Sequence, residues 1–423
     1  MVKNFGYKCS LCGAEYTQEQ VTYTCPKDNG NLDVVLDYNY LKQQQMDKLV
    51  QSNEPSLWRY LPLLPVNDPG GEGTPFHAAG WTPVFQPKQL AKKLGVSHLW
   101  IKDESRNPSA SFKDRASAVV VARAREIGAE VVVTASTGNA GAALACMAAA
   151  VGQKAVIFAP RTAPPAKIAQ LLIFGARVLL VDGTYDQAFD LSIQASNEFG
   201  WYCRNTGYNP FTAEGKKTAA LEIWEWWMQD IGKNKSNDAN HPHKTLNIFV
   251  SVGDGNIISG IHKGIKDLIA VGLTPENSFR IFGVQAEGSA AVANAFFAKT
   301  ETIIPVSAKT IADSISVDLP RDGVRAVRAV TQTGGEYFLV SDHEIISAIA
   351  DLGPTGIFAE PAGATAYAGF VKALHSGKIH PEEPVLVLNT GSGLKDVRAA
   401  MQAVEEAPVI EPSLDAVKKT LGL

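Results

Sequence analysis

A single lysine stands in an unusual setting near an expected helix start. Lys113 lies between Phe112 and Asp114 in the stretch S-A-S-F-K-D-R-A-S, residues 109–117, which follows a short apolar run at residues 98–102. A surface lysine does not need an aromatic and an acidic neighbour at such a place. A lysine held among apolar groups loses part of its charge and can act as a nucleophile. We therefore predict that Lys113 is a nucleophilic catalytic residue.

Small and polar residues follow two predicted strands, at the place where ligands bind in open α/β sheets. The first run is S-T-G-N-A-G at residues 136–141, which opens an alanine-rich helix. Backbone N–H groups at a helix start suit a carboxylate, and the hydroxyls of Ser136 and Thr137 add donors. We predict that Ser136, Thr137 and Gly138 bind the carboxylate of a substrate. Asn139, taken alone, is best explained as a helix cap.

The second run is G-D-G-N-I-I-S-G at residues 253–260, and it matches neither familiar phosphate loop. The Walker pattern requires lysine after its last glycine, where this chain has Ile261, and the dinucleotide fingerprint requires a closer spacing of its last two glycines. A glycine-rich turn at a helix N-terminus still suits one phosphate. We predict that this turn binds a single phosphate, mainly through its backbone N–H groups. We call the segment the phosphate cradle, and its residues are Gly253, Asp254, Gly255, Asn256 and Ile257.

Two further segments have both a structural and a functional interpretation. N-T-G-S-G-L-K at residues 389–395 follows an apolar run. It is either a tight turn or a source of a hydroxyl, from Thr390, for the nitrogen of a heterocycle. E-P-A-G-A at residues 360–364 has small residues that open a helix. For Glu360 and its neighbours we expect close packing rather than a place in a cleft.

Strand and helix patterns alternate along most of the chain, and they must position these segments. From about residue 96 onward, short β-branched runs each precede a stretch of helical period, which is typical of parallel strands with helical crossovers. We predict a doubly wound α/β fold in two lobes with a cleft between them. We expect the polar run 233–244 to be an exposed loop. The predicted strands are 131–136, 155–159, 177–181, 246–252, 280–284 and 384–388.

The composition is that of a globular protein with a large core: of 423 residues, 45% are hydrophobic and 19% are charged. A formal net charge of −4 provides no basic surface, so we expect no nucleic-acid partner. No apolar run approaches the roughly 20 residues that cross a bilayer. The first residues, MVKNFGYKCSLCG, lack the apolar core of a secretory signal. We expect a cytoplasmic protein with no membrane partner.

Three of the five cysteines fall in the first 25 residues, as C-S-L-C at 9–12 and then C-P-K-D at 25–28. Two CxxC pairs would predict a zinc ribbon with four thiolate ligands, but Asp28 stands in place of the fourth cysteine. The segment is either a zinc site of three cysteines and one aspartate or a degenerate ribbon held by its hairpins and by packing. The sequence favours neither, and we assign no metal ligand from it.

A reactive lysine, a phosphate cradle, a carboxylate-binding loop and a hydroxyl for a heterocycle are together what pyridoxal phosphate requires. The segments that supply them resemble motifs of the fold-type II pyridoxal-phosphate enzymes. N-P-S-A-S-F-K-D-R at residues 107–115 is similar to the family's N-P-T-G-S-F-K-D-R, and the resemblance extends from about residue 71 to residue 398. Three segments resemble threonine synthases in particular: T-A-S-T-G-N-A-G at 134–141, N-P-F-T-A-E-G-K-K-T at 209–218 and T-G-S-G-L-K-D at 390–396.

The resemblance implies a role for each of these residues. Lys113 would form the Schiff base with the cofactor and then act as proton shuttle. Asn139 would bind the 3′-hydroxyl of the cofactor ring, and Thr390 would face the ring nitrogen. The phosphate cradle would hold the cofactor phosphate, and residues 136–138 the substrate carboxylate. The activity implied is that of a carbon–oxygen lyase, which converts O-phospho-L-homoserine and water into L-threonine and phosphate.

We divide the chain into three parts on this basis. A ribbon-like segment at residues 1–37 precedes a large cofactor domain, which is formed by residues 38–116 and 205–423. A small α/β domain at residues 117–204 is inserted into it. The expected partner is a small amino-acid substrate, and a homodimer is common among relatives.

One position departs from the family pattern and leaves alternatives open. Many threonine synthases carry arginine in the stretch N-P-x-R-x-E-G, where it suits the substrate's own phosphate; this chain has Thr212 there. One alternative is another fold-type II lyase, such as a threonine/serine dehydratase, a diaminopropionate ammonia-lyase or a β-replacing synthase. The other is a non-catalytic protein that has kept the fold. The cations that could replace the arginine are Lys216, Lys217, Lys167, Arg161 and Arg204.

Overall fold

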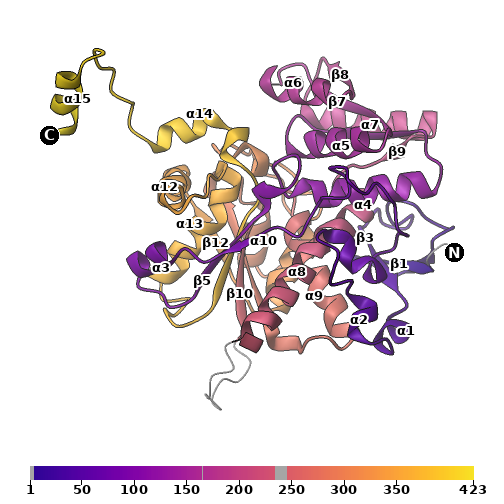
Figure 1. The fold of residues 1–423 in the computed structure, drawn as a ribbon. Coiled ribbons are helices and arrows are strands. Elements are labelled where there is room, and N and C mark those ends of the chain that lie inside the picture. The colour runs from indigo at the N-terminus through magenta and orange to yellow at the C-terminus, as the bar shows by residue number, and fades with distance from the viewer. Residues whose placement is uncertain (1–3, 164, 234–244) are drawn as a thin grey trace.

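Three β-sheets organise the chain, and the computed structural model describes residues 4–163, 165–233 and 245–423. A large sheet has the strand order β12-β11-β10-β13-β5-β4, a small sheet the order β8-β7-β6-β9, and a third sheet near the N-terminus the order β2-β1-β3 (Figure 1). The strands are Phe5–Cys9 (β1), Glu15–Thr17 (β2), Leu32–Leu36 (β3), Val84–Phe85 (β4), Leu99–Asp103 (β5), Val131–Ala135 (β6), Lys154–Pro160 (β7), Arg177–Val181 (β8), Tyr202–Cys203 (β9), Leu246–Ser251 (β10), Phe279–Ala286 (β11), Tyr337–Val340 (β12) and Val385–Asn389 (β13).

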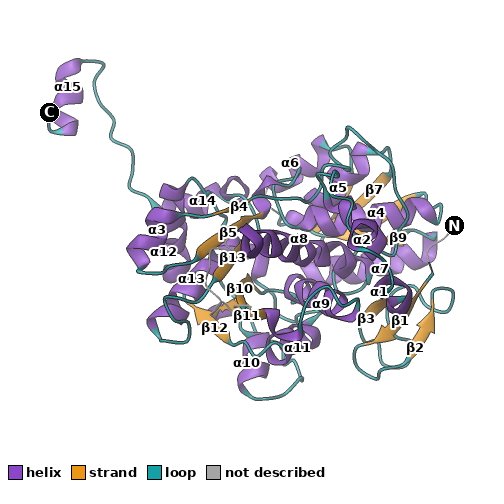
Figure 2. Ribbon diagram, turned by 60° about the horizontal axis from the view of Figure 1, so that its bottom comes forward, coloured by secondary structure: helices purple, strands orange, loops and turns teal. Residues whose placement is uncertain are grey.

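Helices surround the two larger sheets (Figure 2). Their apolar faces and the strands form a core that continues from the small sheet into the large one. The helices are Tyr38–Lys42 (α1), Met46–Leu49 (α2), Lys88–Leu94 (α3), Lys113–Glu126 (α4), Asn139–Ala150 (α5), Pro165–Ile173 (α6), Tyr185–Phe199 (α7), Phe211–Lys233 (α8), Asn256–Ala270 (α9), Ala291–Phe297 (α10), Gly323–Gln332 (α11), Asp342–Leu352 (α12), Pro361–His375 (α13), Val397–Ala400 (α14) and Leu414–Leu421 (α15).

The strand directions confirm the predicted doubly wound α/β class. Every pair in the small sheet is parallel, and so is every pair in the large sheet except the edge pair of β4 with β5. The six predicted strands are β6, β7, β8, β10, β11 and β13, which differ from the prediction only at their ends. The short strands β4, β9 and β12 were not predicted. Of the polar run expected to be a loop, residues 234–244 lie outside the described residues.

Close helix contacts bring α8 against both α4 and α9, which lie on either side of it. A Cβ atom at Gly215 in α8 would lie 2.1 Å from the carbonyl oxygen of Arg115 in α4. A Cβ atom at Gly260 in α9 would lie 2.5 Å from the Cβ atom of Lys216. Both distances are too short for any side chain, so only glycine permits the approach. Gly260, the last glycine of the run 253–260, is therefore a helix-packing residue, which explains why that run matches no phosphate-loop pattern.

The two ends of the chain differ in how they pack. The N-terminal sheet lies against the body, and its buried side chains, such as Phe5 and Tyr7, belong to the main core. The C-terminal helix α15 lies apart from the body at the end of an extended segment (Figure 1). Among the described helices, none is both long and apolar enough to cross a membrane.

The loop that leads into α4 is paired with the loop that follows β13. The Phe112 N–H donates to the Thr390 carbonyl oxygen at 2.9 Å, and the Ser392 N–H donates to the Ala110 carbonyl oxygen at 3.1 Å. Ala110 has φ of 63°, in the left-handed region, where an alanine side chain is strained. The family motif has glycine at this position. The chain therefore holds the approach to Lys113 in a conformation that its own residue does not favour.

We expect Ala110→Gly to raise the free energy of unfolding by about 1 kcal/mol, because glycine adopts the left-handed conformation without strain. Urea unfolding of the variant and the parent protein measures this difference. Ala118→Gly, in the interior of α4, is the matched control and should lower stability by at least about 1 kcal/mol. A variant at position 110 that is no more stable than the parent would show that the loop is not strained.

Candidate active site

Lys113 is the first residue of α4, and its side chain lines a cleft of about 350 Å³. A cleft of this size suits a small ligand. Burial lowers the pKa of the Lys113 amine; the charge of Arg204 lowers it too, whereas Glu360 and Asp254 oppose the shift. The positive end of the helix dipole acts in the same direction as burial. The lowered pKa favours the uncharged amine, which is the form that the predicted role of Lys113 requires.

The neighbours of Lys113 in the motif face away from the cleft and fix the helix start. The Asp114 carboxylate accepts hydrogen bonds from the backbone N–H, at 2.6 Å, and the hydroxyl of Ser109. Arg115 is fully buried; its guanidinium donates to Glu104 at 2.7 Å and to Glu222 at 2.7 Å. The two side chains that follow Lys113 are thus held inside the protein, while Lys113 itself lines the cleft.

The predicted carboxylate-binding loop lies on the wall of the cleft that belongs to the small sheet. Ser136, Thr137 and Gly138 all line it, between the end of β6 and the start of α5. The Gly138 N–H donates to the Ser136 hydroxyl oxygen at 3.2 Å. The structure therefore places these residues in the same cleft as Lys113, at a helix N-terminus. Their binding of a substrate carboxylate stays a prediction.

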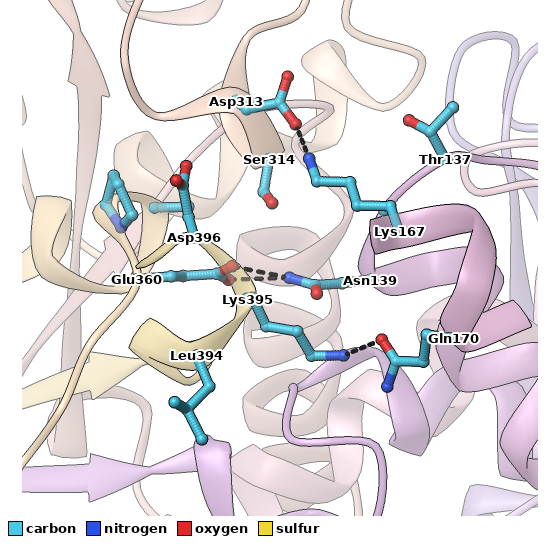
Figure 3. A pocket seen from close by; sticks show the side chains of 13 residues that line it. Thr137, Asn139, Lys167, Gln170, Asp313, Ser314, Glu360, Leu394, Lys395 and Asp396 are labelled. Atoms are coloured by element: carbon cyan, nitrogen blue, oxygen red, sulfur yellow. Dashed lines mark hydrogen bonds and ion pairs between the residues drawn. The ribbon is translucent and has the colours of Figure 1, made fainter. Parts of the chain in front are cut away.

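Glu360 corrects one of our expectations. Its side chain is buried and lines the cleft, and Asn139 Nδ2 donates to its two carboxylate oxygens at 2.8 and 3.1 Å (Figure 3). Close packing is present too, because a Cβ atom at Gly391 would lie 2.2 Å from Glu360 Oε1. Burial raises the pKa of Glu360, while its bond with Asn139 and the charge of Lys113 lower it. Asn139 is thus held by an acid inside the cleft and is not a simple helix cap.

The phosphate cradle forms the inner part of the cleft. Its five residues, 253–257, line that part together with Lys113 and Lys216. Gly255 has φ of 87°, which turns the chain from β10 into α9 and leaves Asn256 as the first helical residue. The helix begins at the cleft, so its first N–H groups face a ligand there. Asp254 also lines the cleft, and its Oδ1 accepts the Arg321 N–H at 3.3 Å.

Thr390 directly follows β13 and is buried. Its carbonyl oxygen accepts the N–H of Phe112, the residue before Lys113. The hydrogen bond ties the Thr390 loop to the lysine loop. The proposed contact of the Thr390 hydroxyl with a ring nitrogen stays a prediction.

The structure separates the five cations that could replace the family's arginine. Lys217 is buried in an ion pair with Asp267 at 2.8 Å, and the exposed Arg161 pairs with Asp182 at 3.4 Å. Lys167 pairs with Asp313 at the mouth of the cleft (Figure 3). These three are already neutralised, which leaves Lys216 and Arg204.

Lys216 and Arg204 line the cleft, fully buried and without an ion pair within the described residues. Lys216 Nζ donates to the amide oxygen of Asn256, at the start of α9. Arg204 donates through Nη1 to the Thr206 hydroxyl at 2.7 Å and through Nε to the Ser117 hydroxyl at 3.2 Å, while its Nη2 is buried with no partner. Burial lowers the pKa of Arg204 to about 10, so it is charged at neutral pH. A buried charge without an opposite charge is costly, so an anionic ligand fits both positions.

Side chains from both lobes meet across the mouth of the cleft (Figure 3). Lys395 Nζ donates to Gln170 Oε1 at 3.0 Å, and Lys167 reaches Asp313, so α6 contacts two loops of the large sheet. None of these contacts has a local sequence signal, because the partners are far apart in the chain. Several cleft-lining residues were not predicted from the sequence for this reason: Tyr185, Thr206, Asp313, Ser314 and Arg321.

The residues present fit pyridoxal phosphate. Lys216 and the start of α9 offer positive charge and N–H donors for one phosphate, and Lys113 offers an amine in the same part of the cleft. The unpartnered Nη2 of Arg204 remains for a second anionic group. Asn139 lines the same cleft as Lys113, and the Thr390 loop is hydrogen-bonded to the lysine loop, so these two residues would be available to the ring of the cofactor.

Comparisons with known proteins agree with this chemistry. A family model described as pyridoxal-phosphate dependent enzyme matches residues 76–391. A threonine synthase of Methanocaldococcus jannaschii is 36% identical over 98% of this chain and 98% of its own. A threonine synthase of Methanosarcina acetivorans is 35% identical over 98% of each chain.

Solved structures agree on the fold. The chain is similar to processed threonine deaminase isoform 2 from Solanum lycopersicum, with a TM-score of 0.65 and 23% identity over 85% of this chain and 89% of that one. Diaminopropionate ammonia lyase from Escherichia coli gives a TM-score of 0.64 at 20% identity, over 78% and 90% of the two chains. At these identities the likeness concerns the fold alone. The family match and the full-length relatives go further: the chain belongs to the pyridoxal-phosphate-dependent enzymes, and among them to the threonine synthases.

Proposed function

We propose that the protein is a pyridoxal-phosphate-dependent threonine synthase that converts O-phospho-L-homoserine and water into L-threonine and phosphate. The observation that carries the proposal is one cleft that holds the partly buried amine of Lys113 and two buried basic side chains, Lys216 and Arg204, which have no carboxylate partner within the described residues. This substrate brings one phosphate and the cofactor brings another. The number of unpaired cations therefore matches the number of phosphates to be bound.

The cofactor phosphate is assigned to the phosphate cradle. Lys216 lines only the inner part of the cleft, beside the first residues of α9. Burial lowers the pKa of the Lys216 amine well below its usual value, and the charges of Lys113 and Arg204 lower it further. A phosphate at the cradle would favour the charged form again. When bound there, the cofactor would supply a conjugated ring that takes up negative charge from the substrate carbons.

The substrate's phosphate is assigned to Arg204. This residue lines the outer part of the cleft, with Thr206 and the carboxylate-binding loop, and not the inner part. Its unpartnered Nη2 and the Thr206 hydroxyl provide donors that suit a phosphate. The guanidinium thus replaces the arginine that the family places where this chain has Thr212. The Thr212 hydroxyl instead donates to the Asn209 carbonyl oxygen at 2.7 Å.

Lys113 is assigned the proton transfers. Its amine has a lowered pKa and lies at the junction of the two parts of the cleft. From there it removes the proton at the substrate Cα and carries protons at Cβ and Cγ while phosphate leaves, before water adds at Cβ. Ser136, Thr137 and Gly138 hold the substrate carboxylate so that Cα faces this amine. Glu360 orients Asn139, whose Oδ1 is left for the ring hydroxyl.

We also propose a division into domains, a cellular location and a set of partners. We divide the chain into residues 1–37, a large domain of 38–116 with 205–423, and a small domain of 117–204, because each part has its own sheet. A cytoplasmic location agrees with the five free cysteines. A small amino-acid substrate, no nucleic-acid or membrane partner and a homodimer stay predictions.

We expect purified, cofactor-supplied protein to release threonine and phosphate in equal amounts from O-phospho-L-homoserine. Serine, threonine and diaminopropionate serve as competing substrates, with ammonia and keto acid measured alongside phosphate. Lys113→Ala should abolish turnover, since Lys113 is the one amine among the described residues that lines both parts of the cleft. If the protein releases ammonia from an amino acid but no phosphate from phosphohomoserine, it is another lyase of this fold and not a threonine synthase.

We expect Arg204→Gln to lower kcat/KM for phosphohomoserine roughly ten- to hundred-fold, the effect of losing a charge-assisted hydrogen bond. The loss should appear mainly in KM, with the cofactor absorbance retained, because Lys216 still binds the cofactor phosphate. Arg161→Gln, which removes an exposed arginine outside the cleft, is the matched control and should leave kcat/KM unchanged. An unaltered KM in the Arg204 variant would show that the substrate phosphate binds elsewhere.

A further inference from the structure

Four side chains of the N-terminal segment converge on one point outside the cleft. They form what we call the thiol cluster: Cys9, Cys12, Cys25 and Asp28. The sulfur atoms and a carboxylate oxygen all lie within 4.8 Å of one another. None of the cysteines forms a disulfide. Cys9 ends β1, and the other three lie in the turns on either side of β2, so two separate turns of the chain are brought together here.

The spacing within the thiol cluster is that of ligands around a single tetrahedral ion. Sulfur ligands at about 2.3 Å from zinc lie roughly 3.7 Å from each other, and a sulfur and an oxygen ligand roughly 3.5 Å apart. Cys12 Sγ and Cys25 Sγ are 3.7 Å apart. Cys9 Sγ lies 3.3 and 3.6 Å from the two carboxylate oxygens of Asp28. A cubane iron–sulfur cluster would hold its ligand atoms further apart, since the cluster itself lies between them.

The two turns have the same backbone hydrogen bonds. In the first, the Gly13 N–H donates to the Cys9 carbonyl oxygen at 3.1 Å and the Cys9 N–H to the Ala14 carbonyl oxygen at 2.8 Å. In the second, the Asn29 N–H donates to the Cys25 carbonyl oxygen at 2.9 Å and the Cys25 N–H to the Gly30 carbonyl oxygen at 3.0 Å. Each turn thus presents its first and fourth side chains in one direction. Asp28 holds the position that Cys12 holds in the first turn.

A metal-free arrangement accounts poorly for this convergence. Hydrogen bonds of thiols are weak, so they provide little energy to hold two turns together. The strands that carry these turns are only five, three and five residues long, and small sheets of this kind are commonly stabilised by a metal or a disulfide. Soft thiolates exclude magnesium and calcium and favour zinc. Cys12 and Asp28 are exposed, so an ion can reach the cluster.

We propose that the thiol cluster binds one zinc ion, with Asp28 as the fourth ligand. The site is closed by four protein ligands, which is typical of a structural ion. The ion would hold together the N-terminal segment, which Asn31 attaches to the rest of the protein. Asn31 Nδ2 donates to the Arg321 carbonyl oxygen at 3.1 Å and also to the Gly207 carbonyl oxygen. Arg321 lines the cleft and Gly207 follows Thr206, which also lines it. The ion thereby stabilises the outer wall of the cleft without contact with a ligand there.

The test is zinc content, measured by elemental mass spectrometry on full-length protein purified under reductant without chelator. We expect about one zinc per chain, and at least roughly ten-fold less in Cys12→Ser. Asp28→Asn should lose its zinc to a chelator that the parent resists, whereas Asp28→Cys, which completes a four-cysteine site, should retain it. Glu15→Gln, an exposed carboxylate on β2, is the matched control and should bind zinc like the parent.

Cobalt keeps the proposal testable if zinc is lost during purification. Reduced, metal-free protein should bind one Co²⁺ and show the intense visible bands of a tetrahedral thiolate site. These bands should shift to longer wavelength in Asp28→Cys, because sulfur replaces oxygen. Protein that contains no zinc and gives no such cobalt spectrum would overturn the proposal. Metal content unchanged by Cys12→Ser would overturn it as well, since the ion would then lie elsewhere. Neither outcome bears on the synthase reaction.

Discussion

The position of Lys113 depends on a buried group of charges at the start of α4. Arg115 lies between Glu104 and Glu222, and Lys102 Nζ donates to Glu222 at 2.7 Å. Burial alone would raise the pKa of Glu222, but the charges of Arg115 and Lys102 outweigh it and lower the pKa to about 2. Removal of one member of such a group costs about 3–5 kcal/mol. This buried group of charges fixes the first turn of α4, so that Lys113, two residues before Arg115, lies at the cleft.

In the cleft itself, unlike at the start of α4, the buried basic side chains have no carboxylate partner within the described residues. At the helix base each cation has its carboxylate, whereas Lys216 and Arg204 have amide and hydroxyl partners only. The unpaired charge of Arg204 destabilises the protein without its ligands, and the lowered pKa of Lys216 means that its charged form also needs an anion beside it, so both positions favour binding of a phosphate. The cleft is open where the small sheet faces the large one, with Lys167 and Lys395 reaching across (Figure 3). Affinity for phosphorylated ligands and a lower stability without them therefore have one cause.

Local patterns predicted the parts of the site that lie on strand-to-helix loops. Lys113, residues 136–138 and residues 253–257 all line the cleft, because each follows the carboxyl end of a parallel strand, where ligands bind in open α/β sheets. The sequence could not place Glu360, since its partner Asn139 is far away in the chain and the surrounding small residues indicate packing equally well. It also could not separate Arg204 from Arg161, because only the tertiary structure decides which guanidinium has a carboxylate beside it. Glycines were ambiguous for the same reason: Gly255 turns the cradle, while Gly260 packs α9 against α8.

The central claim is that the cofactor forms a covalent bond with the amine of Lys113, and this bond can be detected directly. Cofactor-supplied protein is reduced with borohydride, digested and examined by peptide mass spectrometry. We expect the cofactor mass on the peptide that contains Lys113, and on no peptide with Lys216, Lys102 or Lys167. An unmodified Lys113 in protein that retains the cofactor would contradict the assignment of this amine as the reactive group, and with it the arrangement of the whole cleft.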